Sequence, residues 1–156
     1  TGRKIRTRNQ YSWAPIVEIA YLFIGIFVTM TPALLFLNAH AASLGLQQPW
    51  QYFYTTGALS SVLDNTPTAL AFHTVALGLS ETTNLVAGVP ESILKAIAAG
   101  AVFFGAMTYI GNGPNFMVKA ISDENGVNMP SFFGYLVWSF GILIPVFLLD
   151  SLLFFL

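Results

Sequence analysis

A short polar stretch inside a long apolar run decides the fold, and it reads Ser60-Ser61-Val62-Leu63-Asp64-Asn65-Thr66-Pro67-Thr68. The apolar run around it extends from Trp50 to Leu79. An ionisable group at membrane depth costs ~3 to more than 10 kcal/mol, depending on the reference state. Such groups mark ion or substrate paths, so this stretch predicts half of an ion-binding site inside a membrane.

The composition of the whole chain is that of a membrane protein. Of the 156 residues, 55% are hydrophobic and 8% are charged, whereas soluble domains carry about 25% charged residues. The net charge of −1 argues against nucleic acid as a partner, and the absence of cysteine excludes disulfides and thiolate metal sites. Residues 1–12 form a basic segment that the positive-inside rule assigns to the cytoplasm, with Arg3, Lys4, Arg6 and Arg8.

The apolar runs predict an all-α integral membrane fold. A first helix is expected at 16–37, because at ~1.5 Å per residue this length crosses the hydrocarbon core. A last helix is expected at 132–156. The runs 50–80 and 93–121 lie between them, and each contains a polar interruption.

The run 50–80 is compatible with two structures. Pro67 disfavours helical geometry at Thr66, and the side chains of Asp64 and Asn65 can bond local backbone groups in a turn. A break with its tip at Leu63–Pro67 is therefore predicted. The chain either turns back there as a re-entrant hairpin, whose arms are each too short to cross, or continues as one kinked span.

The second interruption reads Gly111-Asn112-Gly113-Pro114-Asn115. Its glycines and proline favour an unwound helix, with an upper piece at 93–110 and a short lower piece at 116–121. Together with the first interruption it gives the expected helix-breaking residues, namely Pro67, Gly111, Gly113 and Pro114.

Both interruptions offer oxygen atoms that suit a hard cation such as Na⁺. A broken helix exposes carbonyl groups where one piece ends and N–H groups where the next begins. The expected ion-binding side chains are Ser60, Ser61, Asp64, Asn65, Thr66, Asn112 and Asn115, with Na⁺ at Asp64, Asn65 and Asn112. One carboxylate that holds either Na⁺ or a proton, but not both, is the simplest chemistry for exchange.

Each of these features also has a purely structural interpretation. Asp64 can be a helix cap at a kinked span, and the Gly-Asn-Gly-Pro-Asn sequence can be an ordinary kink. His73 is more often a hydrogen-bonded core residue than a proton relay. An intramembrane hydrolase that uses Ser60 or Ser61 is disfavoured, because His73 is the only nearby candidate base and nothing indicates an oxyanion hole.

The two motifs resemble those of a known group. Residues 60–68 and 110–115 are similar to the second-half motifs of the ion transporter superfamily, which includes NhaD-type sodium/proton antiporters, the arsenite pump channel subunit, and citrate and dicarboxylate carriers. The resemblance runs from Trp13 to the end and is nearest to the sodium/proton antiporter or citrate transporter-like branch. It implies an inverted-repeat fold with an elevator-like motion of the site, and it favours the hairpin at 50–80.

The chain departs from this family pattern in two ways. Dicarboxylate carriers typically show Ser-Asn-Thr at the hairpin tip, where this chain has Asp64-Asn65-Thr66. A fixed negative charge there would repel an anionic substrate unless Na⁺ or H⁺ neutralised it, which favours sodium/proton exchange over citrate uptake. The chain also shows one hairpin motif and one broken-helix motif, so residues 13–156 are expected to be the C-terminal half of a transporter.

The expected function is therefore secondary active transport, with sodium/proton antiport first and no enzymatic activity. The alternatives are a citrate or dicarboxylate carrier of the same fold, and a non-transporting membrane scaffold or accessory subunit. The expected location is the bacterial inner membrane, crossed several times. The expected partners are the lipid bilayer, the N-terminal half of the same transporter and, as one option, a second copy in a homodimer. No cofactor is expected, and Na⁺ is the transported or coupling ion.

Overall fold

The structure, a computed structural model, describes residues 2–8, 14–78 and 84–156. The chain forms two compact units, Thr1–Ala33 and Leu34–Leu156. The described residues are mainly helical, as the apolar runs predicted, and they also include one pair of short strands.

Two helices account for the described residues of the first unit. α1 (Arg3–Arg8) lies within the basic segment 1–12, of which residues 9–12 fall outside the described ranges. α2 (Ala14–Ala39) contains the predicted first helix, continues through Pro32 and runs on into the second unit.

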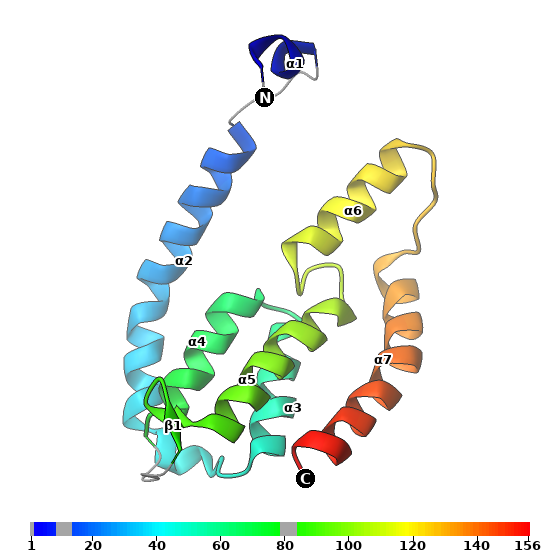
Figure 1. Ribbon diagram of the computed structural model, residues 1–156. Helices are drawn as coiled ribbons and strands as arrows, with labels where there is room; N and C mark the ends of the chain where they lie inside the picture. The colour runs from blue at the N-terminus through cyan, green and yellow to red at the C-terminus, as the bar shows by residue number, and fades with distance from the viewer. Residues whose placement is uncertain (1, 9–13, 79–83) are drawn as a thin grey trace. The chain divides into compact units, whose positions relative to one another are not determined.

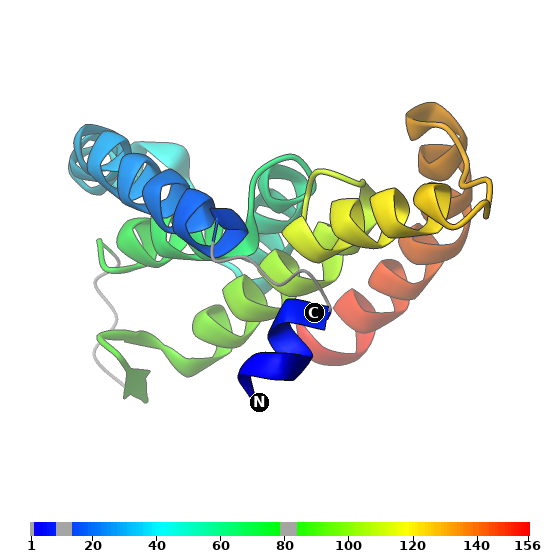
Figure 2. The same ribbon diagram turned by 90° about the horizontal axis from the view of Figure 1, so that it is seen from above.

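The second unit is built around three helices that contact one another. The chain passes from α2 through a short 3₁₀ helix, η1 (Ala41–Leu44), into α3 (Pro49–Ser60) and α4 (Asn65–Ala76). α5 (Glu91–Phe104) packs against both α3 and α4. In both views α5 lies between α4 and α7, the last helix (Figure 1, Figure 2).

Small residues let α3 and α5 approach closely. A Cβ atom on Gly100 would overlap the carbonyl oxygen of Phe53, and one on Gly57 would overlap the ring of Phe104. Helices in membranes associate mainly through such close packing, because lipid offers no hydrophobic drive between them. The core around this contact consists of large apolar side chains that are almost fully buried, including Tyr52, Phe53, Val75, Ile93 and Ile97.

The first interruption separates α3 from α4. α3 ends at Ser60 and α4 begins at Asn65, so the break covers residues 61–64 and lies earlier than the predicted tip at Leu63–Pro67. Pro67 is buried in the first turn of α4 and does not break the helix, because a proline is tolerated where its N–H would have no helical partner. The break therefore lies just before Pro67, and Thr66, which was expected to be non-helical, belongs to α4.

A small hairpin leads into α5. β1 (Leu85–Val86) pairs antiparallel with β2 (Val89–Pro90). Ala87 and Gly88 between them have φ values of 53° and 84°. Positive φ at both central residues is the geometry of a type I′ turn, which matches the twist of the flanking strands.

The second interruption separates α5 from α6 (Gly113–Glu124). α5 ends at Phe104 and passes into a short 3₁₀ helix, η2 (Gly105–Met107), before the irregular residues 108–112. The predicted upper piece, 93–110, is therefore too long. Gly113 and Pro114 belong to the first turn of α6 and do not break a helix, because proline is favoured at such a position.

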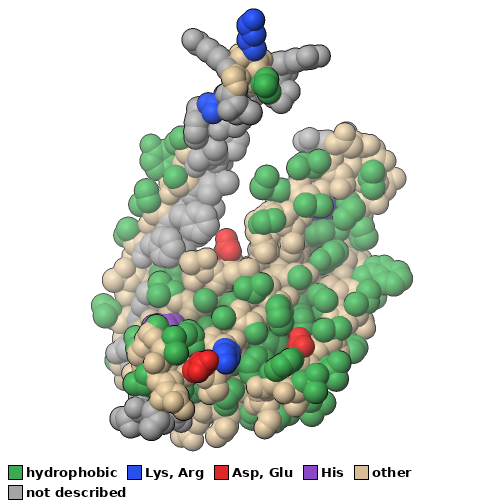
Figure 3. Space-filling view, in the orientation of Figure 1, with side chains coloured by type: hydrophobic (Ala, Val, Ile, Leu, Met, Phe, Trp, Pro, Cys, Tyr) green, Lys and Arg blue, Asp and Glu red, His purple; other side chains and the backbone are tan. Residues whose placement is uncertain are grey.

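α7 (Phe132–Phe154) completes the second unit and begins where the Ser131 side chain accepts a hydrogen bond from the Gly134 N–H. Of the described residues, only those of α7 form a helix long and apolar enough to cross a membrane, with a mean hydropathy of 2.1 and little of its surface buried. Figure 3 shows hydrophobic side chains spread over the face that α6 and α7 present, among few charged ones. The exposed apolar side chains on α7 include Phe133, Val137, Ile142, Leu149 and Leu153.

Candidate functional site

The two interruptions lie against each other, and Asn65 joins them. When its amide is oriented to suit its neighbours, the NH₂ group donates to the carbonyl oxygen of Ala101 at 2.8 Å and to that of Gly111 at 3.3 Å. The two hydrogens of this group are shared with a third acceptor, Ser60 Oγ at 3.0 Å, and Ser60 Oγ in turn donates to the Ala101 carbonyl at 2.5 Å. Residues far apart in the sequence thus share one polar network at the start of α4.

A second connection runs through Thr108, in the irregular segment after η2. Its hydroxyl donates to the carbonyl oxygen of Ser61 at 2.5 Å and accepts from the Gly111 N–H at 2.8 Å. The first interruption is therefore bonded to the second at both of its ends, by Ser61 at its first residue and by Asn65 directly after it.

Carbonyl oxygens converge on Gly111, which is buried at this junction. A Cβ atom on Gly111 would lie 2.8 Å from the Ser61 oxygen and 2.9 Å from the oxygens of Ser60 and Gly105. These oxygens come from the ends of two helices, α3 and α5, where carbonyl groups lack helical partners. Such a cluster of partial negative charge is suited to a hard cation and unsuited to an anion.

Gly105, directly after the end of α5, has no room for a side chain. A Cβ atom there would overlap the terminal amide of Asn65. The carbonyl groups that follow are bonded by side chains, since Tyr135 Oη donates to Ala106 and Ser139 Oγ donates to Met107, both at 2.7 Å. A continuing helix would have used these carbonyls itself, so α7 stabilises the early end of α5.

Asn115 bonds backwards across the second interruption. Its Nδ2 donates to the carbonyl oxygens of Gly105 at 2.9 Å and Thr108 at 3.1 Å. Asn115 lies in the first turn of α6, so these bonds fix that helix to the backbone on either side of η2. The amide nitrogen of this predicted ligand therefore supports the backbone of the site.

Asp64 caps α4. Its half-buried carboxylate accepts a hydrogen bond from the Asn65 N–H at 2.7 Å. Asn112 precedes α6 in the equivalent position, but its side chain makes no capping bond. In the described part of the chain no hydrogen bond joins Asp64 to Asn112, so the three residues chosen for Na⁺ are not bonded to one another as a single group.

The remaining predicted residues occupy the edges of the site. Thr66 is exposed and lines a largely apolar groove of about 440 Å³ between α4 and α5, together with His73. The hydroxyl of Ser61 donates to the Ala58 carbonyl at 2.8 Å within α3, so only the backbone of Ser61 contacts the second interruption.

Sequence reasoning missed Thr108 and Gly105. A hydroxyl side chain that accepts from N–H groups two and three residues later is a recognised turn motif, so Thr108 ahead of Gly111 carried a usable signal. The sequence carried no signal for Gly105, because an isolated glycine in a helical pattern is common. Its role follows only from the Asn65 side chain, which lies where a Cβ atom of residue 105 would be.

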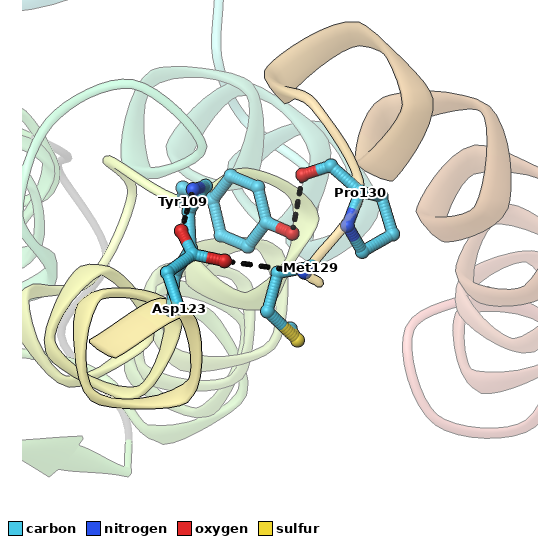
Figure 4. A network of polar contacts seen from close by, with 5 residues as sticks. Tyr109, Asp123, Met129 and Pro130 are labelled. Carbon is cyan, nitrogen blue, oxygen red and sulfur yellow. Dashed lines mark hydrogen bonds and ion pairs between the residues drawn. The ribbon is translucent and has the colours of Figure 1, made fainter. Parts of the chain in front are cut away.

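A further polar network anchors the chain beyond the site (Figure 4). Tyr109 Oη donates to the Pro130 carbonyl at 3.1 Å, and the Asp123 carboxylate pairs with Lys119 at 2.5 Å and accepts from the Met129 N–H at 3.2 Å. The hydrogen bond from Lys119, followed by that from Met129, holds the pKa of Asp123 below its usual range. The Asp123–Met129 bond ties the last turn of α6 to the loop before α7, and the Tyr109–Pro130 bond ties the irregular segment before α6 to the same loop.

Comparison with known proteins supplies the family. No curated protein and no solved structure matches the chain. A family model described as "Putative citrate transport" matches residues 1–155. A match over nearly the whole chain, together with the apolar helix α7, indicates a membrane transporter, and the chain belongs to this citrate transporter-like family.

Proposed function

We propose that the chain is the C-terminal half of a secondary transporter that exchanges Na⁺ for H⁺ across the bacterial inner membrane. The convergence of the Ser60, Ser61 and Gly105 carbonyl oxygens on Gly111 carries this proposal. Asp64 supplies a negative charge at the first interruption. Oxygen ligands with one carboxylate are the ligand set that a hard cation prefers.

The hydrogen bonds around these carbonyls leave room for an ion. The Ser61 oxygen accepts one side-chain bond from Thr108, and the Gly105 oxygen accepts one from Asn115. A carbonyl oxygen has two lone pairs, so the Ser61 oxygen retains one for a cation. Asp64 then carries either the charge that balances Na⁺ or a proton, and this competition couples the two ions.

The lengths of α3 and α4 support a re-entrant hairpin. Each helix has 12 residues, or ~18 Å, whereas the hydrocarbon core is ~30 Å thick. Interrupted, unusually short segments point to the binding site in transporters. In this arrangement α2 and α7 cross the membrane, while the hairpin and the interruption after α5 meet at its midplane.

The test is proton movement in proteoliposomes that contain the full-length protein. A pulse of Na⁺ should dissipate an acid-inside pH gradient, and Asp64→Asn should abolish this effect. Asp150→Asn is the matched control, because Asp150 is another half-buried acid but lines a different pocket, near the end of α7. Exchange that persists in Asp64→Asn would remove Asp64 from the mechanism.

The family description favours a second candidate, a citrate carrier of the same fold. α4 and α6 both begin at the site, and helix N-termini attract carboxylate groups. Uptake of labelled citrate that requires Na⁺, without Na⁺-driven proton release, would select this candidate. A non-transporting scaffold predicts neither flux, and substitutions at Asp64, Asn65 or Asn112 would then affect folding alone.

A further inference from the structure

The hydroxyl of Thr108 uses its whole hydrogen-bonding capacity at the junction of the two interruptions. It donates to the Ser61 carbonyl at 2.5 Å and accepts from the N–H groups of Gly111 and Ile110 at 2.8 and 3.2 Å. A hydroxyl has one donor and two acceptor lone pairs, so none is left for an ion. Thr108 is also buried, at 5% exposure. Any effect on transport must therefore act through the groups that it bonds.

The groups that Thr108 bonds belong to the cluster of carbonyl oxygens around Gly111. Ser61 contributes one of the oxygens that face Gly111, and Gly111 is the residue they surround. The other bond between the two interruptions, from the Asn65 amide to the Gly111 carbonyl, is longer, at 3.3 Å. The Thr108 hydroxyl is thus the short connection that fixes how far the end of α3 lies from Gly111.

We propose that Thr108 is the positioning residue of the ion site, which sets the separation of the two interruptions and hence the spacing of the carbonyl ligands. This inference rests on the proposed function. The backbone of Thr108 is itself held, because Asn115 Nδ2 donates to its carbonyl oxygen at 3.1 Å. Its φ and ψ of −132° and 164° are extended, a conformation that suits a β-branched side chain.

Two variants distinguish the effect of the Thr108 hydroxyl from the effect of the side chain's shape. Thr108→Val keeps the shape and leaves the Gly111 N–H and the Ser61 carbonyl without their partner, whereas Thr108→Ser keeps the hydroxyl. Thr55→Val is the matched control, because the Thr55 hydroxyl bonds its own helix, with the Gln51 carbonyl at 2.6 Å.

The measurement is the Na⁺ concentration that gives half-maximal exchange by the full-length protein in proteoliposomes. Thr108→Val should raise this Na⁺ concentration about tenfold, because the loss of a buried hydrogen bond lets the carbonyl ligands move apart and weakens Na⁺ binding. The maximal rate should change by less than about twofold, because Thr108 does not take part in the later steps of transport. Thr108→Ser and Thr55→Val should stay within about twofold of wild type. An unchanged Thr108→Val, or an equal rise in Thr108→Ser, would overturn the proposal.

Hydrogen exchange at residues 110–111 tests the positioning without transport. The amide hydrogens of Ile110 and Gly111 should exchange faster in Thr108→Val and at the wild-type rate in Thr108→Ser. If wild-type protein carries citrate in place of Na⁺, the same ratio is measured with citrate, and only the choice of substrate is rejected. If it carries neither, the proposed function is wrong. Unchanged amide hydrogen exchange at residues 110–111 in Thr108→Val would then reject the role of Thr108 as well.

Discussion

At the scale of single residues, Gly111 has no room for a side chain. Three backbone oxygens, those of Ser60, Ser61 and Gly105, would lie within 2.9 Å of its Cβ atom. Backbone atoms cannot move aside as a flexible side chain can, so a methyl group here has to push the two interruptions apart. Gly113, two residues later, has nothing within 4 Å of the equivalent position. The two glycines of this motif therefore have different roles.

We predict that Gly111→Ala destabilises the protein by ~1–3 kcal/mol, the usual range for overpacking a tight site. Thermal unfolding of the purified full-length protein in detergent measures this change. Gly113→Ala is the control, and it should be neutral or slightly stabilising because alanine is the better helix former at the start of α6. Equal melting temperatures for Gly111→Ala and Gly113→Ala would contradict the close packing around Gly111.

Residue types were predictable at this site, but their bonding was not. The sequence marked Asn65 and Asn115 because carboxamides are rare in apolar runs, and both lie at the junction. Both were expected to bind an ion, whereas in the structure their Nδ2 atoms donate hydrogen bonds to backbone carbonyl groups. Which end of an amide faces a partner depends on contacts far away in the chain, as with Ala101 and Asn65, and no local pattern encodes it.

At the scale of helices and strands, the sequence indicated both interruptions but placed neither boundary correctly. Proline and glycine suggested breaks at 63–67 and 111–115, yet prolines 67 and 114 both lie in the first turn of the next helix. The breaks precede these prolines because the first turn of a helix tolerates them. The early end of α5 depends on hydroxyl groups of α7, Tyr135 and Ser139, a tertiary effect that a local pattern cannot include.

The end of α6 carries a prediction that depends on pH. The pKa of Asp123 lies below its ordinary value of 3.8, first because of the Lys119 hydrogen bond and then because of the Met129 N–H. A depressed folded-state pKa means that the carboxylate stabilises the fold above pH 3.8, and that this contribution is lost as the pH falls through the lowered pKa. The contact between α6 and the loop before α7 should therefore loosen in acid.

We predict that the hydrogen-exchange protection of the Met129 amide falls as the pH drops below 3.8, after correction for the intrinsic exchange rate. Asp123→Asn should remove this dependence, because the side chain can no longer lose a charge. Glu91→Gln serves as the control, since Glu91 forms a comparable ion pair with Lys95 on another helix. Protection at Met129 that is the same at all pH values would show that Asp123 does not hold the loop.

At the scale of the whole molecule, the distribution of apolar surface needs an explanation beyond the core. Large hydrophobic side chains are exposed along all of α7, and the described part of the chain has few charged groups near them (Figure 3). A soluble protein rarely exposes a continuous apolar surface of this size. Membership of a transporter family supplies the explanation, because lipid or the apolar surface of another transporter segment can cover such a helix.

A substitution at Ile142 tests whether the exposed face of α7 contacts lipid, because Ile142 lies near the middle of α7 and is 59% exposed. If this face meets hydrocarbon, Ile142→Lys should cost ~2.5–3.5 kcal/mol on membrane insertion and sharply lower the yield of integrated protein. Val127→Lys is the matched control, since Val127 is 57% exposed but lies in the polar loop between α6 and α7. The measurement is the fraction of full-length protein that stays in membranes after alkaline carbonate extraction. Equal fractions for the two variants would mean that the exposed face of α7 does not lie in the apolar part of a bilayer.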